Sequence, residues 1–456
     1  MKPASLFPSE ETLAINTDLY ELTMAAAYFK AGRIEDRATF ELFTRRLPAA
    51  RNFLVAAGLE QALHFIENLR FNDQTLQYLR GLEVFDSIED AFFDYLGGLK
   101  FSGEITALPE GTVFFPNEPI LQVTAPIIEA QIVETYLINS INFQTMVASK
   151  AARICLAAQG KPVIDFGTRR AHSPQAGVLA ARAAFIGGCE GTSNVLAGYQ
   201  MDIPVYGTMA HSFVQFFDQE TEAFQRFHEA FPQGTTFLVD TYDTLAGVRK
   251  VLDLAGEMAA VRLDSGDLHH LALETRKLLD EHNRSEVQIF ASGDLDEEKI
   301  QDLAEAPIDG YGVGTNLVVS ADAPSCNLVY KLVEVGREDT VSPKMKTSPG
   351  KATLPHRKQI HRLIREGSFS SDLLCTSRET PPKGKGETLS LLKDFFKDGQ
   401  LVRELPDLLQ IREYAGKQLQ RLPAPLKALQ AEEVYPVEYS PRLRRIQKEL
   451  EENFAL

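Results

Sequence analysis

The sequence predicts an α/β protein in which parallel strands alternate with helices. Short apolar runs recur between residues 160 and 320, each run ends in a polar or glycine cluster, and each is followed by a segment of helical length. The runs lie in KPVIDFGTRR, IPVYGTMAHS, TTFLVDTYDT, AAVRLDSGD, VQIFASGD and IDGYGVGTN. Such alternation is typical of a closed barrel or an open parallel sheet, and in both folds ligands bind at the carboxyl ends of the strands.

A mixed region of helix and strand is expected before this repeat. The segment TDLYELTMAAAYFKAG predicts a helix that begins at Thr17 or Asp18 and ends at Gly32. The following segment, DRATFELFTRRLP, has the composition of a strand. Pro and Gly interrupt the β-rich segment 101–126, which favours a small antiparallel sheet, and a long helix is expected over 127–160.

The alternating pattern ends after residue 340. The segment 342–362 is basic and contains Pro and Gly, and the segment 377–388, SRETPPKGKGET, is expected to be an exposed loop. The segment 440–454 predicts a surface helix near the end of the chain.

Composition describes an ordinary soluble globular protein of 456 residues, with 44% hydrophobic and 24% charged residues. The formal net charge of −16 argues against nucleic acid as a partner, although local basic pockets for small phosphorylated ligands remain possible. The four cysteines lie far apart without a CxxC pair, so neither a disulfide framework nor a thiolate zinc site is expected. No segment has the roughly 18 apolar residues that cross a bilayer, and we expect a cytoplasmic protein without membrane contact.

Glycines and a hydroxyl end the last run, IDGYGVGTNLV. Gly310, Gly312 and Gly314 would let the backbone approach a ligand closely, and Thr315 and Asn316 would open a helix whose free N–H groups face an anion. A phosphate site and a tight turn without ligand are both consistent with this stretch. The spacing is neither that of a P-loop nor that of a dinucleotide-binding GxGxxG.

Charged side chains end two other runs. In VRLDSGDL, Asp264 is suited to ribose hydroxyls or a hydrated Mg²⁺, and Arg262 to a carboxylate or phosphate. Alternatively, Asp264 or Ser265 simply caps the next helix. FASGDLDEEKI places Gly293 near a helix start in the same way, with Asp296 expected in the first turn.

Aromatic, cationic and imidazole side chains end two further runs. DFGTRRAH places Phe166 beside Arg169, as a flat anionic ring would require, while an ordinary surface arginine pair is the alternative. VYGTMAHSFVQFF places His211 between small residues and aromatic residues, directly after a strand. A histidine beside apolar residues is most often structural, so its role must be argued from the other strand ends.

Together, these strand ends resemble those of the nicotinate phosphoribosyltransferases. The resemblance rests on TDLYELTMA, DFGTRRAHSPQAG, GTSNVLAG, GTMAHSF, DTYDT, RLDSGDL, GVGTNLV, LVYKLVE and KMKTSPGKATLP, which follow one another over nearly the whole chain. It implies an N-terminal α/β domain over 1–150 that part of 340–456 completes, an irregular α/β barrel over 151–340, and a basic loop with helical segments over 341–456.

The resemblance also implies an activity and its partners. The enzyme would join nicotinate to 5-phosphoribosyl 1-diphosphate, releasing pyrophosphate and forming nicotinate mononucleotide in the salvage of nicotinate for NAD. Mg²⁺ would be the cofactor, ATP would be hydrolysed as a co-substrate, and two chains would share their active sites in a homodimer. His211 matches the histidine that the family phosphorylates from ATP.

The remaining site residues follow from the same motifs. Tyr20 matches a tyrosine that stacks on nicotinate in the neighbouring subunit's site, with Phe166 on the other face of the ring. Arg262 and Thr208 match nicotinate contacts, and Thr315 matches a contact to the phosphoribosyl phosphate. Arg169 matches a site arginine near the ring and the phosphates, and Ser193, Gly293 and Gly314 are also expected to contact substrate. Asp264 is our own inference, not part of the match, for a contact to the ribose or Mg²⁺.

Two positions distinguish this chain. Ser193 in GTSNV stands where the similar nicotinamide phosphoribosyltransferases carry an aspartate, and its neutral side chain avoids repelling the carboxylate of nicotinate. His356 in TLPHRKQ stands where the nicotinate family usually has glycine, so the ligand contacts of Lys351 and Lys358 in that loop remain open.

Two other functions are consistent with such a fold. A catalytically inactive relative that only binds ligand would keep the barrel, but the intact matched residues argue against it. An aldolase-like barrel would need a Schiff-base lysine, and no lysine sits at a strand end in these motifs.

Overall fold

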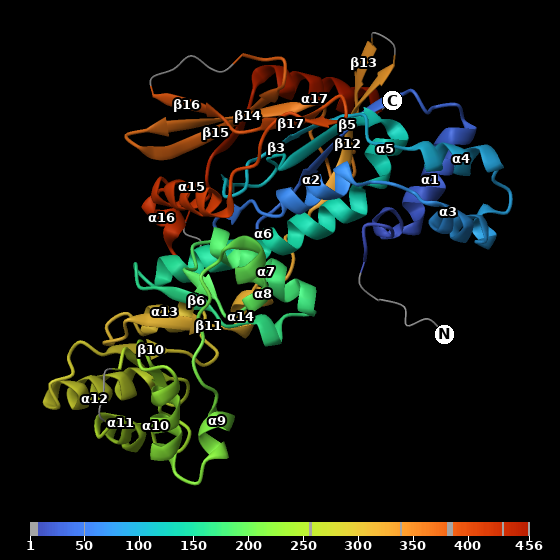
Figure 1. The fold of residues 1–456 in the computed structure, drawn as a ribbon. Coiled ribbons are helices and arrows are strands. Elements are labelled where there is room, and N and C mark those ends of the chain that lie inside the picture. The colour runs from blue at the N-terminus through green and yellow to red at the C-terminus, as the bar shows by residue number, and fades with distance from the viewer. Residues whose placement is uncertain are drawn as a thin grey trace. The chain divides into compact units, whose positions relative to one another are not determined.

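The chain forms two compact units, and Figure 1 shows both as a ribbon. The computed structural model describes residues 8–49, 51–254, 258–337, 340–380, 386–430 and 433–454. The first unit consists of 1–145 and 325–456, so both ends of the chain contribute to it, and the second consists of 146–324. The boundaries expected from sequence were 150 and 340.

The first unit contains helices, three sheets and two short 3-10 turns, Leu13–Ile15 and Glu83–Phe85. Its helices are α1 (Leu19–Lys30), α2 (Leu59–Glu67), α3 (Asp73–Arg80), α4 (Asp90–Gly98), α5 (Ile127–Ile132), α15 (Leu408–Gln420), α16 (Ala424–Lys427) and α17 (Pro441–Phe454). The unit boundary lies within the long helix α6 (Glu134–Ala157).

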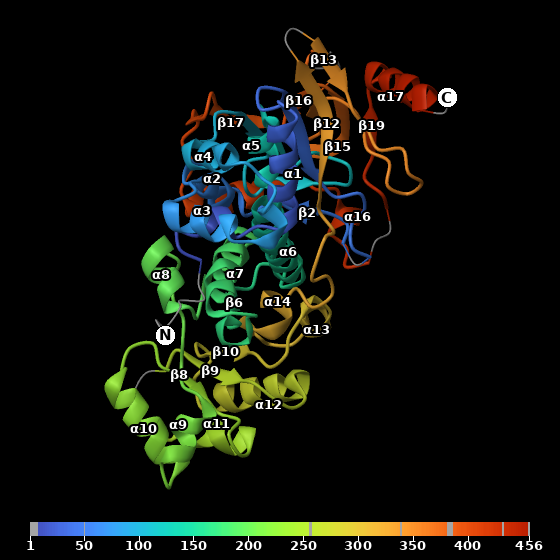
Figure 2. The same ribbon diagram turned by 90° about the vertical axis from the view of Figure 1, so that its right-hand side faces the viewer.

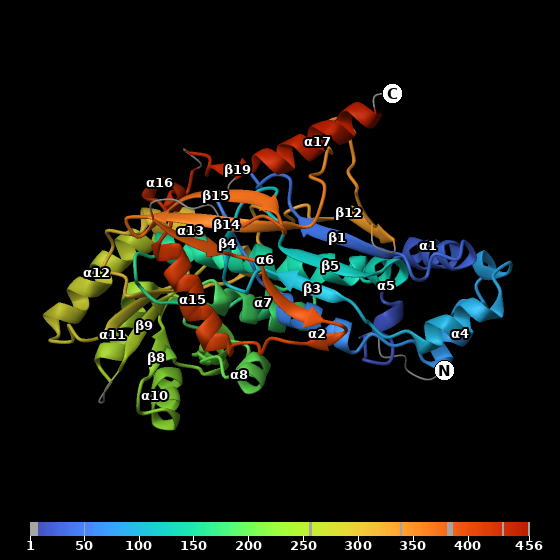
Figure 3. The same ribbon diagram turned by 90° about the horizontal axis from the view of Figure 1, so that it is seen from above.

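The largest sheet of the first unit has seven strands in the order β13-β12-β1-β5-β3-β17-β18. These are β13 (Thr340–Pro343), β12 (Val329–Arg337), β1 (Arg37–Phe43), β5 (Leu121–Pro126), β3 (Glu104–Ala107), β17 (Lys393–Lys397) and β18 (Gln400–Leu401). All its pairings are antiparallel, and Figure 3 shows β1, β5 and β3 side by side.

A second sheet has the order β16-β14-β15-β19, and β2 pairs with β4 separately. The strands are β16 (Glu387–Ser390), β14 (Lys358–Arg365), β15 (Ser368–Thr376), β19 (Val437–Tyr439), β2 (Leu54–Val55) and β4 (Val113–Phe114). Helix α17 packs against β15.

Several elements predicted from sequence are confirmed. Helix α1 begins after Asp18 and ends before Gly32, whose φ of +64° is the left-handed conformation that suits glycine. Strand β1 and helix α17 lie where they were expected, and the long helix is present but breaks at Val133 into α5 and α6. The expected small antiparallel sheet is wrong in size, because β3 and β5 belong to the seven-stranded sheet.

The region after residue 340 differs most from the expectation of a basic loop with helical segments. The helices α15, α16 and α17 are present, but strands β13 to β19 occupy much of the same region. Residues 381–385 of the expected exposed loop lie outside the described residues.

The core of the first unit contains a buried ionic cluster around Arg362 of β14. Its guanidinium donates to the Asp372 carboxylate, with Nε to Oδ1 at 2.9 Å, and to the carbonyl of Val113 at 2.8 Å. The Tyr435 hydroxyl donates to the same carboxylate at 3.0 Å. Burial opposes ionisation of Asp372, but Arg362 keeps the net pKa of that carboxyl below its ordinary value. Burial, followed by the charge of Asp372, holds the pKa of Glu118 well above its ordinary range, which favours the uncharged form of this carboxyl.

The second unit is built around six parallel strands in the order β7-β6-β11-β10-β9-β8. Their bounds are β7 (Gly191–Thr192), β6 (Val163–Asp165), β11 (Gly310–Val313), β10 (Gln288–Ala291), β9 (Ala260–Leu263) and β8 (Thr236–Leu238). The helices are α7 (Pro174–Ile186), α8 (Val195–Met201), α9 (His211–Phe216), α10 (Glu220–Ala230), α11 (Thr244–Leu252), α12 (Leu268–Glu281), α13 (Glu297–Asp302) and α14 (Thr315–Val318), with a 3-10 turn at Thr168–Arg170. Figure 2 shows α12 beside β9 and β10, against which it packs.

One of the six predicted strands is replaced by an irregular segment. In IPVYGTMAHS, Val205 makes a single parallel bridge with Thr192 of β7. Three residues later, the Thr208 hydroxyl donates to the carbonyl of Thr236 in β8 at 2.6 Å. The segment therefore joins the two outer strands, β7 and β8, and closes the ring as an irregular α/β barrel.

A close approach between the ends of β9 and β10 requires glycine at position 293. Its φ is +101°, and an added Cβ would lie 1.9 Å from the carbonyl oxygen of Asp264. Without a side chain there, the loops after these strands meet directly, which brings their polar residues together.

For the buried cluster, we expect Arg362→Met to lower the free energy of unfolding by about 3–5 kcal/mol, because it leaves a buried carboxylate without its cation. Glu118→Gln should cost no more than about 1 kcal/mol, because an uncharged amide replaces an uncharged acid. Urea unfolding followed by circular dichroism suits this chain, which has no tryptophan. Equal losses of unfolding free energy in Arg362→Met and Glu118→Gln would contradict the assignment of a charged Asp372 and an uncharged Glu118.

For the barrel, we expect Gly293→Ala to lower stability by about 3 kcal/mol or more, because it combines backbone strain with a steric clash. Gly234→Ala is the matched control: its φ is +75°, but nothing lies within 4 Å of the added Cβ. The control should cost only about 1–2 kcal/mol for the left-handed backbone. The same urea measurement compares the two variants. A loss of unfolding free energy no larger in Gly293→Ala than in Gly234→Ala would show that residue 293 does not pack tightly against the Asp264 carbonyl.

Candidate active site

The candidate residues of the second unit lie at or just after the carboxyl ends of the barrel strands. Phe166 follows β6, Ser193 follows β7, Arg262 lies near the end of β9, and Thr315 follows β11. Parallel pairing aligns Asp165 with both Thr192 and Val313, so Phe166, Ser193 and Gly314 emerge at one edge. Other candidates in this unit are Arg169, Thr208, His211, Asp264 and Gly293, whereas Tyr20 belongs to the first unit.

His211 is the first residue of α9 and is held by a buried carboxylate. Its Nε2 lies 3.2 Å from Oδ1 of Asp240, which follows β8. The imidazole is 39% exposed, whereas the Asp240 side chain is 1% exposed. The other oxygen of Asp240 accepts from the backbone N–H of Asp264 at 3.1 Å and from the Ser265 hydroxyl at 2.6 Å. The carboxylate thus joins His211 to the loop after β9.

Arg262 lies against an aromatic ring and a carboxylate. Its Nη2 donates to Oδ1 of Asp264 at 2.7 Å, its Nε donates to the Ser292 hydroxyl at 2.8 Å, and its Cζ lies 5.1 Å from the centre of the Phe166 ring. Burial opposes ionisation of Asp264, but the hydrogen bond from Ser292 and the charge of Arg262 bring its net pKa below the ordinary value. An ionised carboxylate, a guanidinium and an aromatic face therefore lie side by side.

Three supporting residues were missed in the sequence. Asp240 and Ser292 hold the groups just described. Asp165 is buried at the end of β6 and accepts from the Thr192 hydroxyl at 2.7 Å and the Gly167 N–H at 2.8 Å, which ties β6 to β7. The sequence did contain a signal for these residues, because each stands at the end of an apolar run: Asp165 in DFG, Asp240 in LVD and Ser292 in FAS.

The glycines of β11 serve packing. An added Cβ at Gly310 would lie 2.6 Å from the Phe290 ring, and one at Gly312 would lie 2.4 Å from the Phe166 ring. The expectation that these two glycines admit a ligand is therefore wrong, because protein aromatic rings occupy the space. The Asn316 amide donates to the carbonyls of Asp294 and Leu295, which anchors the chain after this strand.

The helix caps also differ in part from the expectation. Asp267, and neither Asp264 nor Ser265, caps α12 by accepting from the His270 N–H at 3.0 Å. Asp296 is the N-cap of α13 and does not lie in its first turn. Because Asp267 caps α12, the Asp264 carboxylate is left to accept hydrogen bonds from Arg262 and Ser292.

The carboxylates near Arg262 determine whether this site can hold Mg²⁺. No group of three or more His, Cys, Asp or Glu side chains within the described ranges is arranged to hold a metal. Both oxygens of Asp240 have protein partners, which leaves Asp264 as the available carboxylate beside Arg262. Such a site fits a Mg²⁺ that keeps its waters and is bound mainly through substrate phosphates.

Tyr20 lies in the first unit beside a cavity of about 400 Å³ that Glu134 and Asn142 also line. Its side chain is 47% exposed, and burial of the remainder, followed by the charge of Glu134, raises the pKa of its hydroxyl. Burial raises the pKa of the neighbouring Glu21 to about 7, and Gln131 donates to that carboxyl at 2.6 Å. Tyr20 thus presents a neutral, partly exposed ring.

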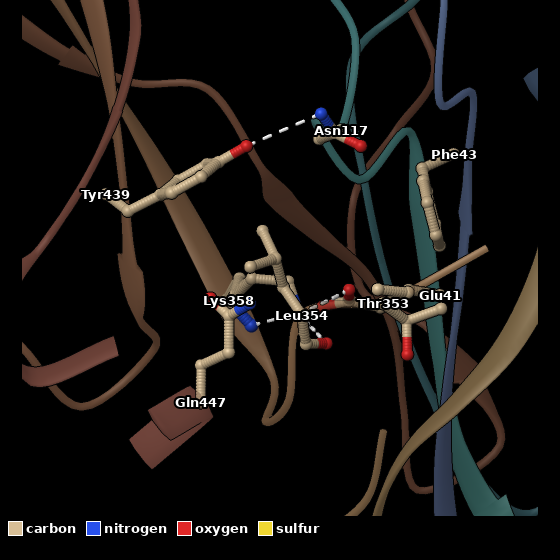
Figure 4. A pocket seen from close by; sticks show the side chains of 9 residues that line it. Glu41, Phe43, Asn117, Thr353, Leu354, Lys358, Tyr439 and Gln447 are labelled. Carbon is tan, nitrogen blue, oxygen red and sulfur yellow. Dashed lines mark hydrogen bonds and ion pairs between the residues drawn. The ribbon is translucent and has the colours of Figure 1, made fainter. Parts of the chain in front are cut away.

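The basic loop is anchored by Lys358, as Figure 4 shows. Its ammonium is buried, forms an ion pair with Glu41 at 2.6 Å, and donates to the carbonyls of Leu354, Pro355 and His356. These contacts occupy Lys358 within the protein. Lys351 has an exposed side chain, and its carbonyl accepts from Arg45.

Helices of the described ranges all lack either the length or the apolar character that crossing a bilayer requires.

Three family models match the chain in succession. The N-terminal domain of nicotinate phosphoribosyltransferase matches 15–142, the C-terminal domain of quinolinate phosphoribosyl transferase matches 147–323, and the C-terminal domain of nicotinate phosphoribosyltransferase matches 385–447.

Relatives from distant organisms match over most of their length. The nicotinate phosphoribosyltransferase pncB2 of Mycobacterium tuberculosis is 47% identical over 440 residues, which cover 94% of this chain and 92% of that protein. The Bacillus subtilis nicotinate phosphoribosyltransferase is 38% identical over 464 residues, with 94% of each chain covered.

Solved structures share the fold. The crystal structure of human nicotinic acid phosphoribosyltransferase has a TM-score of 0.84 and 31% identity, covering 95% of this chain and 99% of that chain. A nicotinate-nucleotide pyrophosphorylase from Pyrococcus furiosus has a TM-score of 0.76 and 27% identity, covering 92% and 99%. By full-length sequence identity and by fold, this chain belongs to the nicotinate phosphoribosyltransferase family.

Proposed function

We propose that this protein transfers phosphoribose from 5-phosphoribosyl 1-diphosphate to nicotinate, with ATP hydrolysis coupled through a phosphohistidine at His211. The products are nicotinate mononucleotide and pyrophosphate, as in the salvage of nicotinate for NAD in the cytoplasm. One observation carries the proposal: a partly exposed imidazole held by a buried carboxylate stands beside the Arg262 and Asp264 cluster at one edge of the barrel.

The geometry favours Nδ1 of His211 as the nucleophile. Asp240 accepts a hydrogen bond from Nε2, so Nε2 carries the proton and Nδ1 keeps its lone pair. Attack by Nδ1 on the γ-phosphorus of ATP forms the N–P bond as the bond to the bridging oxygen breaks, and ADP leaves. Water later takes the phosphoryl group and releases inorganic phosphate. Asp240 stabilises the positive charge that the ring carries in the phosphorylated state.

Nicotinate is proposed to lie against Phe166, with Arg262 supplying a cation for its carboxylate. Arg169 is exposed and has no hydrogen-bond or ion-pair partner within the described part of the chain, so its guanidinium is available for the substrate's negative groups. The Thr208 hydroxyl donates to Thr236, which leaves its oxygen to accept from a ligand.

Transfer requires positioning and charge stabilisation more than covalent chemistry. The nucleophilic ring nitrogen of nicotinate attacks the anomeric carbon, the bond to pyrophosphate breaks, and positive charge develops on the sugar. The ionised Asp264 carboxylate is suited to that charge. Mg²⁺ would supply the positive charge that neutralises the pyrophosphate leaving group; Asp264 is the carboxylate that would hold it, and Thr315 would contact the sugar phosphate.

A homodimer with shared sites is part of the proposal. Tyr20 is half-exposed and would complete the stack on nicotinate in a neighbouring subunit's site. Large apolar side chains are also exposed on the second unit at Val195, Leu196, Tyr199, Val205 and Tyr206. Exposed apolar groups in this number are typical of a surface that another chain covers.

A Schiff-base mechanism receives no support from the barrel. The buried Lys150 of α6 forms ion pairs with Glu297 and with Asp322, the latter at 2.8 Å. These two contacts occupy its side-chain nitrogen, which is therefore not free to attack a carbonyl substrate.

We expect His211→Ala to retain slow transfer and to lose the stimulation by ATP, because the phosphoryl acceptor is absent. His269→Ala is the control, since His269 is exposed on α12. The measurement follows nicotinate mononucleotide and ADP, together with acid-labile phosphate on the protein after incubation with γ-labelled ATP. Full ATP stimulation and a labelled protein in the His211 variant would assign the phosphorylation elsewhere.

We expect Ser193→Asp to lower kcat/KM for nicotinate by at least about tenfold, because two carboxylates about 4 Å apart repel by about 4 kcal/mol at an effective dielectric constant of about 20. Ser193→Asn adds similar volume without charge and should retain more activity. Steady-state kinetics with nicotinate compare the two variants, and an unchanged kcat/KM in Ser193→Asp would refute the role of this position in selecting nicotinate.

A further inference from the structure

A second basic site lies in the first unit. A cavity of about 300 Å³ is bounded by residues of β12, β13 and β15, by the start of α17 and by the residues just before β14. Three arginines, one histidine and two hydroxyl side chains line it, namely Arg357, Arg378, Arg442, His356, Thr376 and Ser377. Among its described lining residues, Glu334 is the one carboxylate. This cationic lining stands out in a protein of net charge −16.

The protein itself neutralises only part of this charge. Arg357 forms an ion pair with Glu104 at 2.8 Å, and Glu334 accepts from Nδ1 of His356 at 2.9 Å. In contrast, no hydrogen bond or ion pair joins the side chains of Arg378 or Arg442 to any described residue. Two guanidinium groups with their full sets of N–H donors therefore remain for a ligand.

The backbone at His356 gives an independent indication. Its φ is +66°, a left-handed conformation that strains a residue with a Cβ. Glycine would adopt this conformation without strain, but only a longer side chain can contact Glu334 and line the cavity. Lys358 fixes the same turn by binding the carbonyls of residues 354 to 356. A strained residue at the wall of a basic cavity is typical of a binding site.

We propose that this cavity binds a small phosphate-bearing molecule. The Arg378 and Arg442 guanidiniums match the oxygen geometry of a phosphate, and the Ser377 hydroxyl adds a further donor. The volume lies at the lower end of the range for ligand pockets, which suits an anion or a short phosphate ester. No residue of the barrel site lines this cavity, so the inference is independent of the proposed reaction.

Equilibrium dialysis with radiolabelled inorganic phosphate on the full chain tests the proposal. We expect R378Q/R442Q to bind one phosphate equivalent fewer than the wild type, or to bind that equivalent at least about tenfold more weakly, the change that a loss of about 1.4 kcal/mol produces. The control is R445Q/K448Q, which removes the same charge from the exposed face of α17, where Arg445 pairs with Glu449 and Lys448 pairs with Glu452. It should bind phosphate as the wild type does.

Competition identifies the ligand class. Displacement of the label from this site by ribose 5-phosphate assigns it to phosphate esters, whereas phosphate binding without such displacement assigns it to the free anion. Equal stoichiometry and affinity in the wild type and both double variants would overturn the proposal. Equal losses in both double variants would also overturn it, because they would reflect net charge alone. Melting temperatures of the three proteins verify that each is folded.

Discussion

The site depends on the two hydrogen-bonding oxygens of one buried carboxylate, Asp240. One oxygen holds His211 on α9, and the other holds the backbone of Asp264 and the hydroxyl of Ser265 after β9. A carboxylate that is 1% exposed is stable only when its oxygens accept hydrogen bonds. Asp240 therefore needs His211 and the loop after β9 in place, and it fixes the position of each relative to the other. The same contact fixes the tautomer of His211 and connects it to the residues that surround Arg262.

The fold of the second unit was predictable because each buried parallel strand appears as a short apolar run that ends in polar residues. Five of the six runs form strands of the barrel, whereas the run at IPVYG makes only one bridge through Val205. Local composition could not reveal this, because closure depends on Thr208 reaching Thr236 across the ring. The first unit was less predictable. Its sheets pair strands from opposite ends of the chain, such as β1 with β12, and no local pattern encodes such a pairing.

The exposed functional side chains of the site were predictable from the sequence, whereas the buried carboxylates that hold them in place were not. Residues at strand ends, such as Phe166, Arg262 and Thr315, were found because parallel strands bring their carboxyl ends together. Asp240 and Asp165 were missed because a buried carboxylate that organises loops has the same sequence pattern as a capping residue. Gly312 was misread for a related reason: a glycine that admits the Phe166 ring cannot be told in sequence from one that admits a ligand.

The most direct test measures product formation from nicotinate or nicotinamide with 5-phosphoribosyl 1-diphosphate and Mg²⁺, with and without ATP, while ADP is followed alongside the mononucleotide. We expect turnover of nicotinate in preference to nicotinamide, with ATP raising the rate and ADP accumulating with product. A preference for nicotinamide, or no turnover of either base, would contradict it.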